Sequence, residues 1–242
     1  MKAMILAAGV GSRLRPLTDS VPKALVEVGG KTMLEHVMQR LKQAGVTEIL
    51  VNLHHLPHAI MQFLGTRGVP GLRLEFSLEP EILDTGGGLK KAAWFFGDGK
   101  PFFLHNVDVY SDLDLPGMYR AHDSGKHLAT LSVRKRASDR ILLFSPEGLL
   151  CGREVVSEGR REWAATPVAD AERLAFDGVH VISPALLPML REEGAFPIMS
   201  AYLRLAGQGE KIAAFRSDTS YWKDIGRPDS LQELRRDLAS RL

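Results

Sequence analysis

The 242-residue sequence has little of what marks several protein classes. Its one cysteine, Cys151, excludes an intramolecular disulfide and a site of several thiolates, and favours a reducing compartment. Lys and Arg number 31 against 29 Asp and Glu, so no basic field is available to hold a nucleic-acid backbone. No apolar run approaches the roughly 20 residues of a membrane-spanning helix. We therefore expect a cytoplasmic protein that binds neither nucleic acid nor membrane.

The remaining composition is that of a globular protein. Hydrophobic residues make up 45% and charged residues 25%, so general disorder is not expected. At the N-terminus, the apolar run Ala3–Val10 is followed at once by Arg13 and Arg15. This order fits a buried strand better than a signal peptide, which would end in a small-residue cleavage site.

Strands and helices alternate in the hydrophobic pattern of the first 110 residues. The pattern predicts strands over 2–8, 48–53, 72–77 and 101–106, and helices between Thr32 and Gly45, over 57–65 and over 86–96. Thr32 has Glu35 three residues later, which is the spacing of a capping box. We therefore expect an α/β fold with a Rossmann-like, doubly wound, mostly parallel sheet and helices on both faces.

The second half of the chain is less regular. The pattern predicts strands over 128–134, 139–150, 174–182 and 211–216, separated in part by the polar stretch 152–172, and helices over 184–191, over 197–207 and from Pro228. No internal repeat, low-complexity tract or long linker is present. We expect a single domain over residues 1–242.

A glycine-rich loop follows the first predicted strand. The segment Gly9–Gly11 permits close approach of a ligand, and Arg13 and Lys23 add two positive charges, as a polyphosphate requires. Two known phosphate-binding patterns do not fit. Leu14 occupies the third glycine position of the dinucleotide fingerprint, and Leu25 stands where the P-loop has its first glycine. Taken alone, the loop also fits a tight turn without a ligand.

The loop is part of a longer pattern. The sequence LAAGVGSRLRPLT over 6–18, followed by PKAL over 22–25, resembles the signature of the sugar-1-phosphate nucleotidyltransferases. The resemblance continues in order at 79–88, 106–108, 176–178 and 222–226. It is closest to the short bacterial N-acetylmuramate-1-phosphate uridylyltransferases and their mannose- or heptose-1-phosphate guanylyltransferase relatives. It implies a GT-A-like fold with a nucleotide-binding half over 1–110 and a sugar-binding half over 111–242.

The resemblance also implies a role for each matching residue. Arg13 and Lys23 would be catalytic, with Arg13 stabilising the leaving pyrophosphate and Lys23 holding the α-phosphate or the sugar phosphate. Asp108 and Asp224 would bind Mg²⁺, the implied cofactor. The implied nucleotide-binding residues are Ala8, Gly9, Gly11, Ser12, Glu79, Gly86 and Gly87, and the implied sugar-binding residues are Asn106 and Gly178.

Taken without the motif, these charged residues have simpler interpretations. Lys23 fits a surface lysine, and Asp224 fits a turn at a strand end. Asp108 fits a turn or a helix N-cap. However, it follows the apolar segment 101–104, which puts it at the carboxyl end of a predicted strand, where open α/β sheets bind ligands.

The expected reaction joins an NTP and a sugar 1-phosphate to give an NDP-sugar and pyrophosphate. The Glu79 carboxylate can accept two N–H bonds from guanine and favours GTP, whereas the longer match at 84–88 favours UTP with N-acetylmuramate 1-phosphate, a cell-wall precursor. GTP with mannose or heptose 1-phosphate is the alternative. Val107 stands where the family usually has Gly or Ala, which leaves the size of the sugar open.

Two further functional classes are compatible with the same motifs. A catalytically silent nucleotide-sugar sensor could keep the phosphate loop, but it would not need two cations and two metal-binding carboxylates together. The second class is a cytidylyltransferase that acts on phosphocholine or an alditol phosphate. In each case we expect a monomer or a small homo-oligomer.

Overall fold

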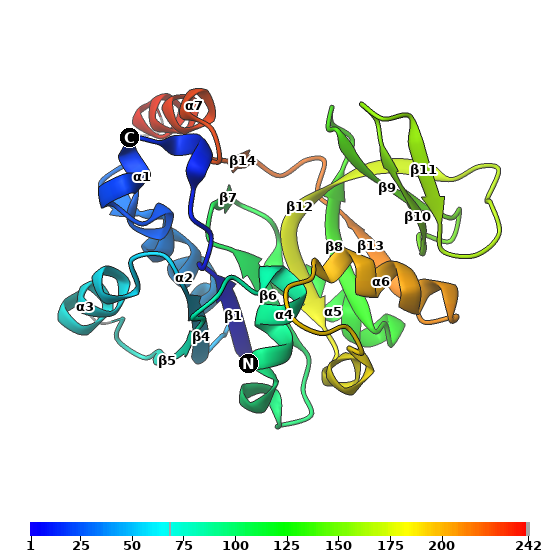
Figure 1. Cartoon of the computed structure of the whole chain (residues 1–242), viewed down its shortest axis with the longest axis horizontal. Coiled ribbons are helices and arrows are strands. Elements are labelled where there is room, and N and C mark those ends of the chain that lie inside the picture. Colours follow the sequence, from blue (N-terminus) through cyan, green and yellow to red (C-terminus); the bar gives the residue numbers. More distant parts are fainter. Residues whose placement is uncertain (68, 241–242) are drawn as a thin grey trace. The chain divides into compact units, whose positions relative to one another are not determined.

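The computed structural model describes residues 1–67 and 69–240, whose contacts group into two units (Figure 1). Unit 1 comprises Met1–Ile82, Leu104–Leu113 and Tyr221–Leu242, and unit 2 comprises Leu83–Phe103 and Asp114–Ser220. The chain therefore leaves unit 1 and returns to it twice. The expectation of a single domain stays a prediction. Among the described residues, no helix combines the length and the apolar character that crossing a membrane requires.

Unit 1 is built on a sheet whose strands stand in the order β6 (Phe102–Asn106, which begins in unit 2), β1 (Lys2–Leu6), β4 (Glu48–Leu53) and β5 (Arg73–Leu78). The pairs β1–β4 and β4–β5 are parallel. The chain runs from β1 through β4 to β5 and then returns to place β6 on the other side of β1. Such a reversal of strand order marks the crevice where open α/β sheets bind ligands.

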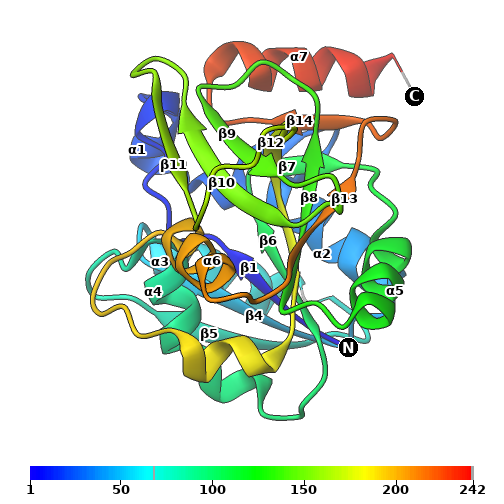
Figure 2. The same ribbon diagram turned by 90° about the vertical axis from the view of Figure 1, so that its right-hand side faces the viewer.

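Helices and short strands complete unit 1. They are α1 (Leu17–Ser20), α2 (Met33–Gln43), α3 (Pro57–Arg67), α7 (Pro228–Ala239), the hairpin β2 (Glu27–Val28) and β3 (Lys31–Thr32), and the antiparallel pair β7 (Val109–Ser111) and β14 (Trp222–Asp224). Figure 2 shows α7 running above β14 and β7. The leucines of α7 pack with Val26, Val28 and Ile225 in one apolar cluster. This cluster secures the C-terminal segment to the N-terminal part of unit 1.

Unit 2 has a mainly antiparallel sheet around the long strand β12. Its strands are β8 (Ala129–Arg134), β9 (Arg140–Phe144), β10 (Leu150–Val155), β11 (Arg160–Trp163), β12 (Glu172–Ile182) and β13 (Ile212–Arg216). Strand β12 pairs antiparallel with β8 and β9, and β13 pairs parallel with β8. The helices of unit 2 are α4 (Asp84–Lys91), α5 (Leu115–Gly125) and α6 (Ile198–Gly207), with 3₁₀ turns at Ala93–Phe96 and Pro184–Met189.

The expected α/β class is confirmed, and in unit 1 the strands lie close to where the sequence predicts them. Thr32 and Glu35 form the expected capping box, with the backbone N–H of Thr32 donating to Glu35 Oε2 at 2.7 Å. The expectation of one strand over 139–150 is wrong. This segment contains β9 and a turn at 145–149 with Gly148 in a left-handed conformation, and β10 begins only at Leu150. The polar stretch 152–172 contains the rest of β10 and all of β11, and helix α5 has no predicted counterpart.

A buried histidine makes the stability of unit 2 sensitive to acid. His122 lies on α5 with 2% of its surface exposed, and its Nδ1 is 3.0 Å from Thr130 Oγ1. The ring of His127 stands 6.4 Å away, centroid to centroid. Burial, with a smaller contribution from His127, lowers the pKa of His122 from 6.5 to about 4. The imidazole is therefore neutral in the folded protein at neutral pH.

We predict that the free energy of unfolding falls as the pH drops from 6.5 towards 4. In this range the unfolded chain binds a proton at His122 and the folded chain does not, which costs the folded state up to about 3 kcal/mol. Burial also lowers the pKa of His105 to about 4, so His105 adds to the dependence of the unfolding free energy on pH. The free energy of unfolding, measured with urea at a series of pH values, should depend less steeply on pH in His122→Gln than in the wild type. The exposed His58→Gln variant is the control, and equal slopes in both variants would contradict the assignment.

Candidate active site

The loop after β1 is held by side chains from two other segments. Gly11 has a φ of +67°, and a Cβ there would lie 2.9 Å from Thr18 Cγ2, so glycine is required. Thr18 Oγ1 donates to the carbonyl of Gly11 at 2.8 Å, and His55 Nε2 donates to the carbonyl of Thr18 at 2.9 Å. Within the loop Ala8 is buried, whereas Gly9 and Ser12 are exposed. The loop is thus fixed at its base and open at its tip.

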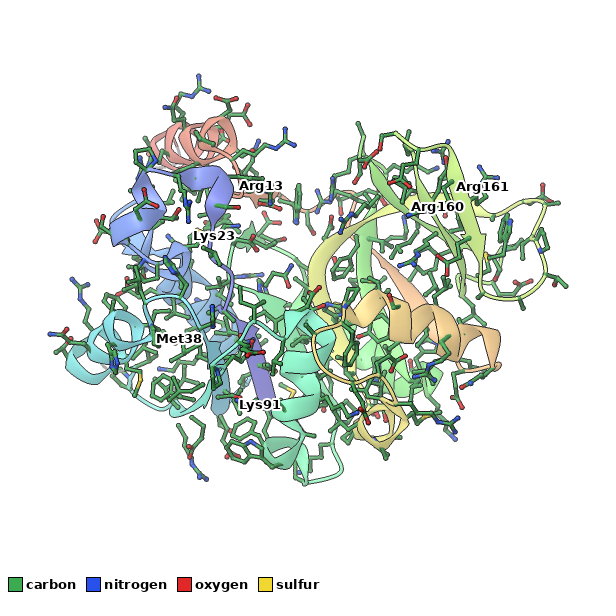
Figure 3. The ribbon with its side chains drawn as sticks, in the orientation of Figure 1. Arg13, Lys23, Met38, Lys91, Arg160 and Arg161 are labelled. Atoms are coloured by element: carbon green, nitrogen blue, oxygen red, sulfur yellow. The ribbon has the colours of Figure 1, made fainter. Side chains whose placement is uncertain are left out.

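Two cations come from the turns that follow this loop (Figure 3). Arg13 lies in the 3₁₀ turn Ser12–Leu14, and Lys23 lies in the turn Lys23–Leu25. Lys23 is buried, and its ammonium forms a short ion pair with Asp108 Oδ2. Burying a lysine in this way requires a partner, since an unpaired buried ammonium is costly.

Two carboxylates are brought together by backbone pairing. Asp108 follows β6, as the sequence predicts, and directly precedes β7. Strand β14 pairs antiparallel with β7, so that Asp224 stands opposite Val109, and the N–H of Ile225 donates to the carbonyl of Asp108 at 3.0 Å. The two acidic residues are distant in sequence but adjacent in unit 1.

The electrostatic balance of this cluster rests on its cations. Burial, followed by the nearby negative charge of Asp108, raises the pKa of Asp224, whereas Lys23 and Arg13 act to lower it. A Cβ on Gly226 would lie 2.7 Å from Asp224 Oδ1 and 2.8 Å from Arg13 Nη2. The glycine therefore leaves the space in which the Arg13 guanidinium approaches the Asp224 carboxylate.

The donor set of the cluster suits Mg²⁺. Asp108 and Asp224 offer carboxylate oxygens, the ligands that Mg²⁺ prefers, and Mg²⁺ is commonly held by one or two carboxylates with water and substrate phosphate completing its shell. Within residues 1–67 and 69–240, no group of three or more His, Cys, Asp or Glu side chains is placed to hold a metal. A closed zinc or calcium cage is thus not formed by these residues, and an open two-carboxylate site fits them.

A buried hydrogen-bond chain links the start of the glycine-rich loop to Glu79. Asn52, at the end of β4, accepts from the backbone N–H of Ala7 at 2.7 Å and donates to Glu79 Oε1 at 2.7 Å. Glu79 is 4% exposed, and His54 Nδ1 donates to its carbonyl at 2.8 Å. Asn52 is not among the site residues predicted from the sequence. Its signal was a polar residue near the end of the otherwise apolar strand EILVNL.

The glycines of α4 have a packing role in unit 2. The N–H groups of Gly86 and Gly87 both donate to the carbonyl of Phe196, at 2.9 and 3.4 Å. A Cβ on Gly86 would lie 2.2 Å from the Phe196 ring, and one on Gly87 would lie 2.4 Å from the carbonyl oxygen of Gly194. Close helix packing therefore explains these glycines, and their role in nucleotide binding stays a prediction.

The two residues expected to bind sugar lie in different units. Asn106 is the last residue of β6 and belongs to unit 1. Gly178 belongs to unit 2 and has a φ of +86° at an irregularity in the pairing of β12 with β8. Its left-handed conformation requires glycine at that bulge. Unit 1 thus gathers Arg13, Lys23, Asp108 and Asp224, and the sugar-binding roles stay predictions.

Comparisons with known proteins agree with this arrangement. A family model described as nucleotidyl transferase matches residues 2–140. N-acetylmuramate alpha-1-phosphate uridylyltransferase of Neisseria meningitidis serogroup B is 32% identical over 239 residues, which is 96% of this chain and 96% of that protein. Mannose-1-phosphate guanyltransferase of Gibberella zeae is 30% identical over 239 residues, and the match covers 94% of this chain but 61% of that protein.

The fold is also similar to that of a solved structure. A UDP-glucose pyrophosphorylase complexed with UDP-glucose superposes with a TM-score of 0.80 at 16% identity, over 100% of this chain and 99% of that one. This likeness confirms the Rossmann-like, mostly parallel central sheet with helices expected from the sequence.

We predict that the Asn52–Glu79 pair can be broken and then restored. Asn52→Asp places two carboxylates together in a buried site and removes the donor to Glu79, so it should destabilise the fold by roughly 2–4 kcal/mol. Adding Glu79→Gln restores a donor–acceptor pair with the roles exchanged, and should recover most of the loss. Urea unfolding of the two single variants and the double variant measures this. Additive losses in the double variant would show that the side chains do not act as a pair.

Proposed function

Because the chain belongs to the nucleotidyl transferase family, we propose that it makes a UDP-sugar from UTP and N-acetylmuramate 1-phosphate. The family and the relatives establish the coarser activity, that of a sugar-1-phosphate nucleotidyltransferase. The observation that carries the proposal is the cluster in unit 1, where Arg13 and Lys23 face Asp108 and Asp224 beside an open glycine loop.

The reaction suits a site built from charges rather than from a general base. A phosphate oxygen of the sugar 1-phosphate attacks the α-phosphorus of the nucleoside triphosphate, forming one P–O bond as the bond to pyrophosphate breaks. The nucleophile is already an anion, so no side chain needs to remove a proton. The site must instead hold two anions together and stabilise the charge that spreads onto the transferred group and the leaving group.

The residues of the cluster divide this work. The exposed tip of the loop at Gly9 offers backbone near the triphosphate, with Gly11 fixing its turn. Arg13 stabilises the leaving pyrophosphate, because its guanidinium is exposed enough to meet a second anion besides Asp224. Lys23 moves from Asp108 towards the α-phosphate or the sugar phosphate when an anion arrives. Asp108 and Asp224 would hold Mg²⁺, which when bound neutralises phosphate charge and acts as a Lewis acid.

The proposed base is uracil, and the support for it comes from the relatives rather than from Glu79. Glu79 Oε1 accepts from Asn52, and a carboxylate oxygen can accept a second hydrogen bond, so this contact does not distinguish uracil from guanine. The uridylyltransferase relative also matches over nearly the full length of both proteins. The carboxylate at this position favours GTP with mannose or heptose 1-phosphate as the alternative.

A nucleotide-sugar sensor is disfavoured by the same cluster. A sensor needs a phosphate loop, but it gains nothing from holding two half-buried like charges beside each other. The raised pKa of Asp224 reports the energetic cost of that arrangement. Such a cost is typical of catalytic sites, where charge is placed for the transition state.

We predict that Asp108→Asn and Asp224→Asn each reduce turnover in the presence of Mg²⁺ by at least about 100-fold, because each variant loses a metal ligand and an electrostatic contact. Pyrophosphate release from UTP and sugar 1-phosphates measures the rate. Asp123→Asn, an exposed aspartate on α5, is the matched control and should keep wild-type turnover. Near-normal rates in Asp108→Asn would rule out this assignment of the metal site.

We also predict that UTP raises the melting temperature more than GTP, CTP or ATP at equal concentration with Mg²⁺. At 100 times its Kd, a ligand that binds only the folded state adds about 2.7 kcal/mol of stability. A thermal-shift panel followed by turnover with the preferred nucleotide measures this. Stronger stabilisation by GTP would assign the chain to the guanylyltransferases, and binding without pyrophosphate release would indicate a sensor.

A further inference from the structure

Unit 1 contains a cavity that Arg13, Lys23, Asp108 and Asp224 do not line. Its volume is about 430 Å³, and it lies among α2, the β2–β3 turn, β7 and α7. The side chains that give it chemical character are Lys31, His36, Gln39, Arg40, Tyr110 and Leu238. The volume falls in the range of about 300–1,000 Å³ that small-molecule sites occupy.

The cavity is lined by cations without a carboxylate. Lys31 and Arg40 both line it, and among the described residues neither forms an ion pair with Asp or Glu. Arg40 Nη2 donates to the carbonyl of Leu113 at 2.6 Å, which fixes the guanidinium. Its Nε is buried inside the protein and donates to no atom of the part of the chain described here. No carboxylate of the wall offsets the charge of this guanidinium, and this favours an anion in the cavity.

The rest of the wall is aromatic and apolar. His36 Nε2 donates to the carbonyl of Val28 at 2.8 Å, which fixes the plane of the imidazole. The Tyr110 ring meets it edge to face with the ring centroids 5.1 Å apart, and Leu238 of α7 supplies an apolar side chain. A free phosphate ion would leave most of this wall unused. An organic group joined to the anion would cover it.

We propose that this cavity binds a small phosphate monoester, with the phosphate at Arg40 and Lys31 and the organic group against His36 and Tyr110. The ligand would lie close to the catalytic carboxylates without touching the phosphate loop. Tyr110 is two residues after Asp108 on β7, the strand that pairs with β14 and so with Asp224. A bound ester therefore contacts β7, which directly follows Asp108 and pairs with the strand that carries Asp224.

Calorimetric titration with phenyl phosphate tests the site, because this ester is neither a nucleotide nor a sugar phosphate. We expect saturable binding to the full-length protein. Gln39 is an exposed residue of the wall, and Gln39→Glu adds a negative charge there with almost no change of side-chain shape. This variant should weaken binding about tenfold. Gln62→Glu makes the same change at an exposed position of α3 outside the cavity and should leave the Kd unchanged. Lys31→Ala, also exposed, should weaken binding as Gln39→Glu does.

A parallel titration of Arg13→Ala separates this cavity from the phosphate loop. Binding that persists in Arg13→Ala and weakens in Gln39→Glu supports the proposal. Binding lost in Arg13→Ala and kept in Gln39→Glu would place the ester at the phosphate loop and overturn it, as would the absence of saturable binding at millimolar ester. Inorganic phosphate binding as tightly as phenyl phosphate would overturn the role of the aromatic wall. Pyrophosphate release by Gln39→Glu should match wild type, so that failure here leaves the proposed transfer reaction standing.

Discussion

The repulsion between Asp108 and Asp224 is the constraint around which unit 1 is arranged. Backbone pairing of β7 with β14 fixes the main chain of Asp108 next to that of Asp224. Lys23 is buried against Asp108, and Arg13 reaches Asp224 through space that Gly226 leaves open. Both cations lie in the turns that follow the glycine-rich loop after β1. The segment after this loop therefore supplies the positive charge that compensates the two carboxylates.

Most of the long elements could be predicted from the sequence, with α5 as the exception, whereas the short strands β7 and β14 could not, for a physical reason. Strands such as 48–53 are buried and four or more residues long, so their apolar run is visible, and the capping box at Thr32 is a local pattern. Strands β7 and β14 have three residues each and owe their existence to each other. Their pairing joins segments more than a hundred residues apart, which periodicity cannot detect. Only the motif resemblance predicted that Asp108 and Asp224 act together.

Glycine shows a second limit of sequence reasoning. The same expectation, contact with a nucleotide, was attached to Gly11 and to Gly86. Gly11 is required by a left-handed φ in the loop, and Gly86 is required by a helix that packs directly on Phe196. Because glycine has no side chain, it permits both a left-handed φ and close packing, so the residue type alone does not show which of the two is required. By contrast, Asn52 is informative, since a buried amide must be paired and here connects Ala7 to Glu79.

The net charge of +2 is not distributed evenly, because positive charge is compensated by carboxylates in one part of unit 1 and not in another. In the cluster of Arg13, Lys23, Asp108 and Asp224, cations and carboxylates are matched. Under the proposed function, an anionic substrate gains attraction there only as Lys23 leaves Asp108 or as a divalent cation joins the carboxylates. In the cavity lined by Lys31 and Arg40, the wall has no carboxylate, which favours an anion directly. The first arrangement couples binding to a rearrangement of charge, which a transfer reaction requires. The cavity lined by Lys31 and Arg40 requires no rearrangement of charge, which suits a site that only binds its ligand.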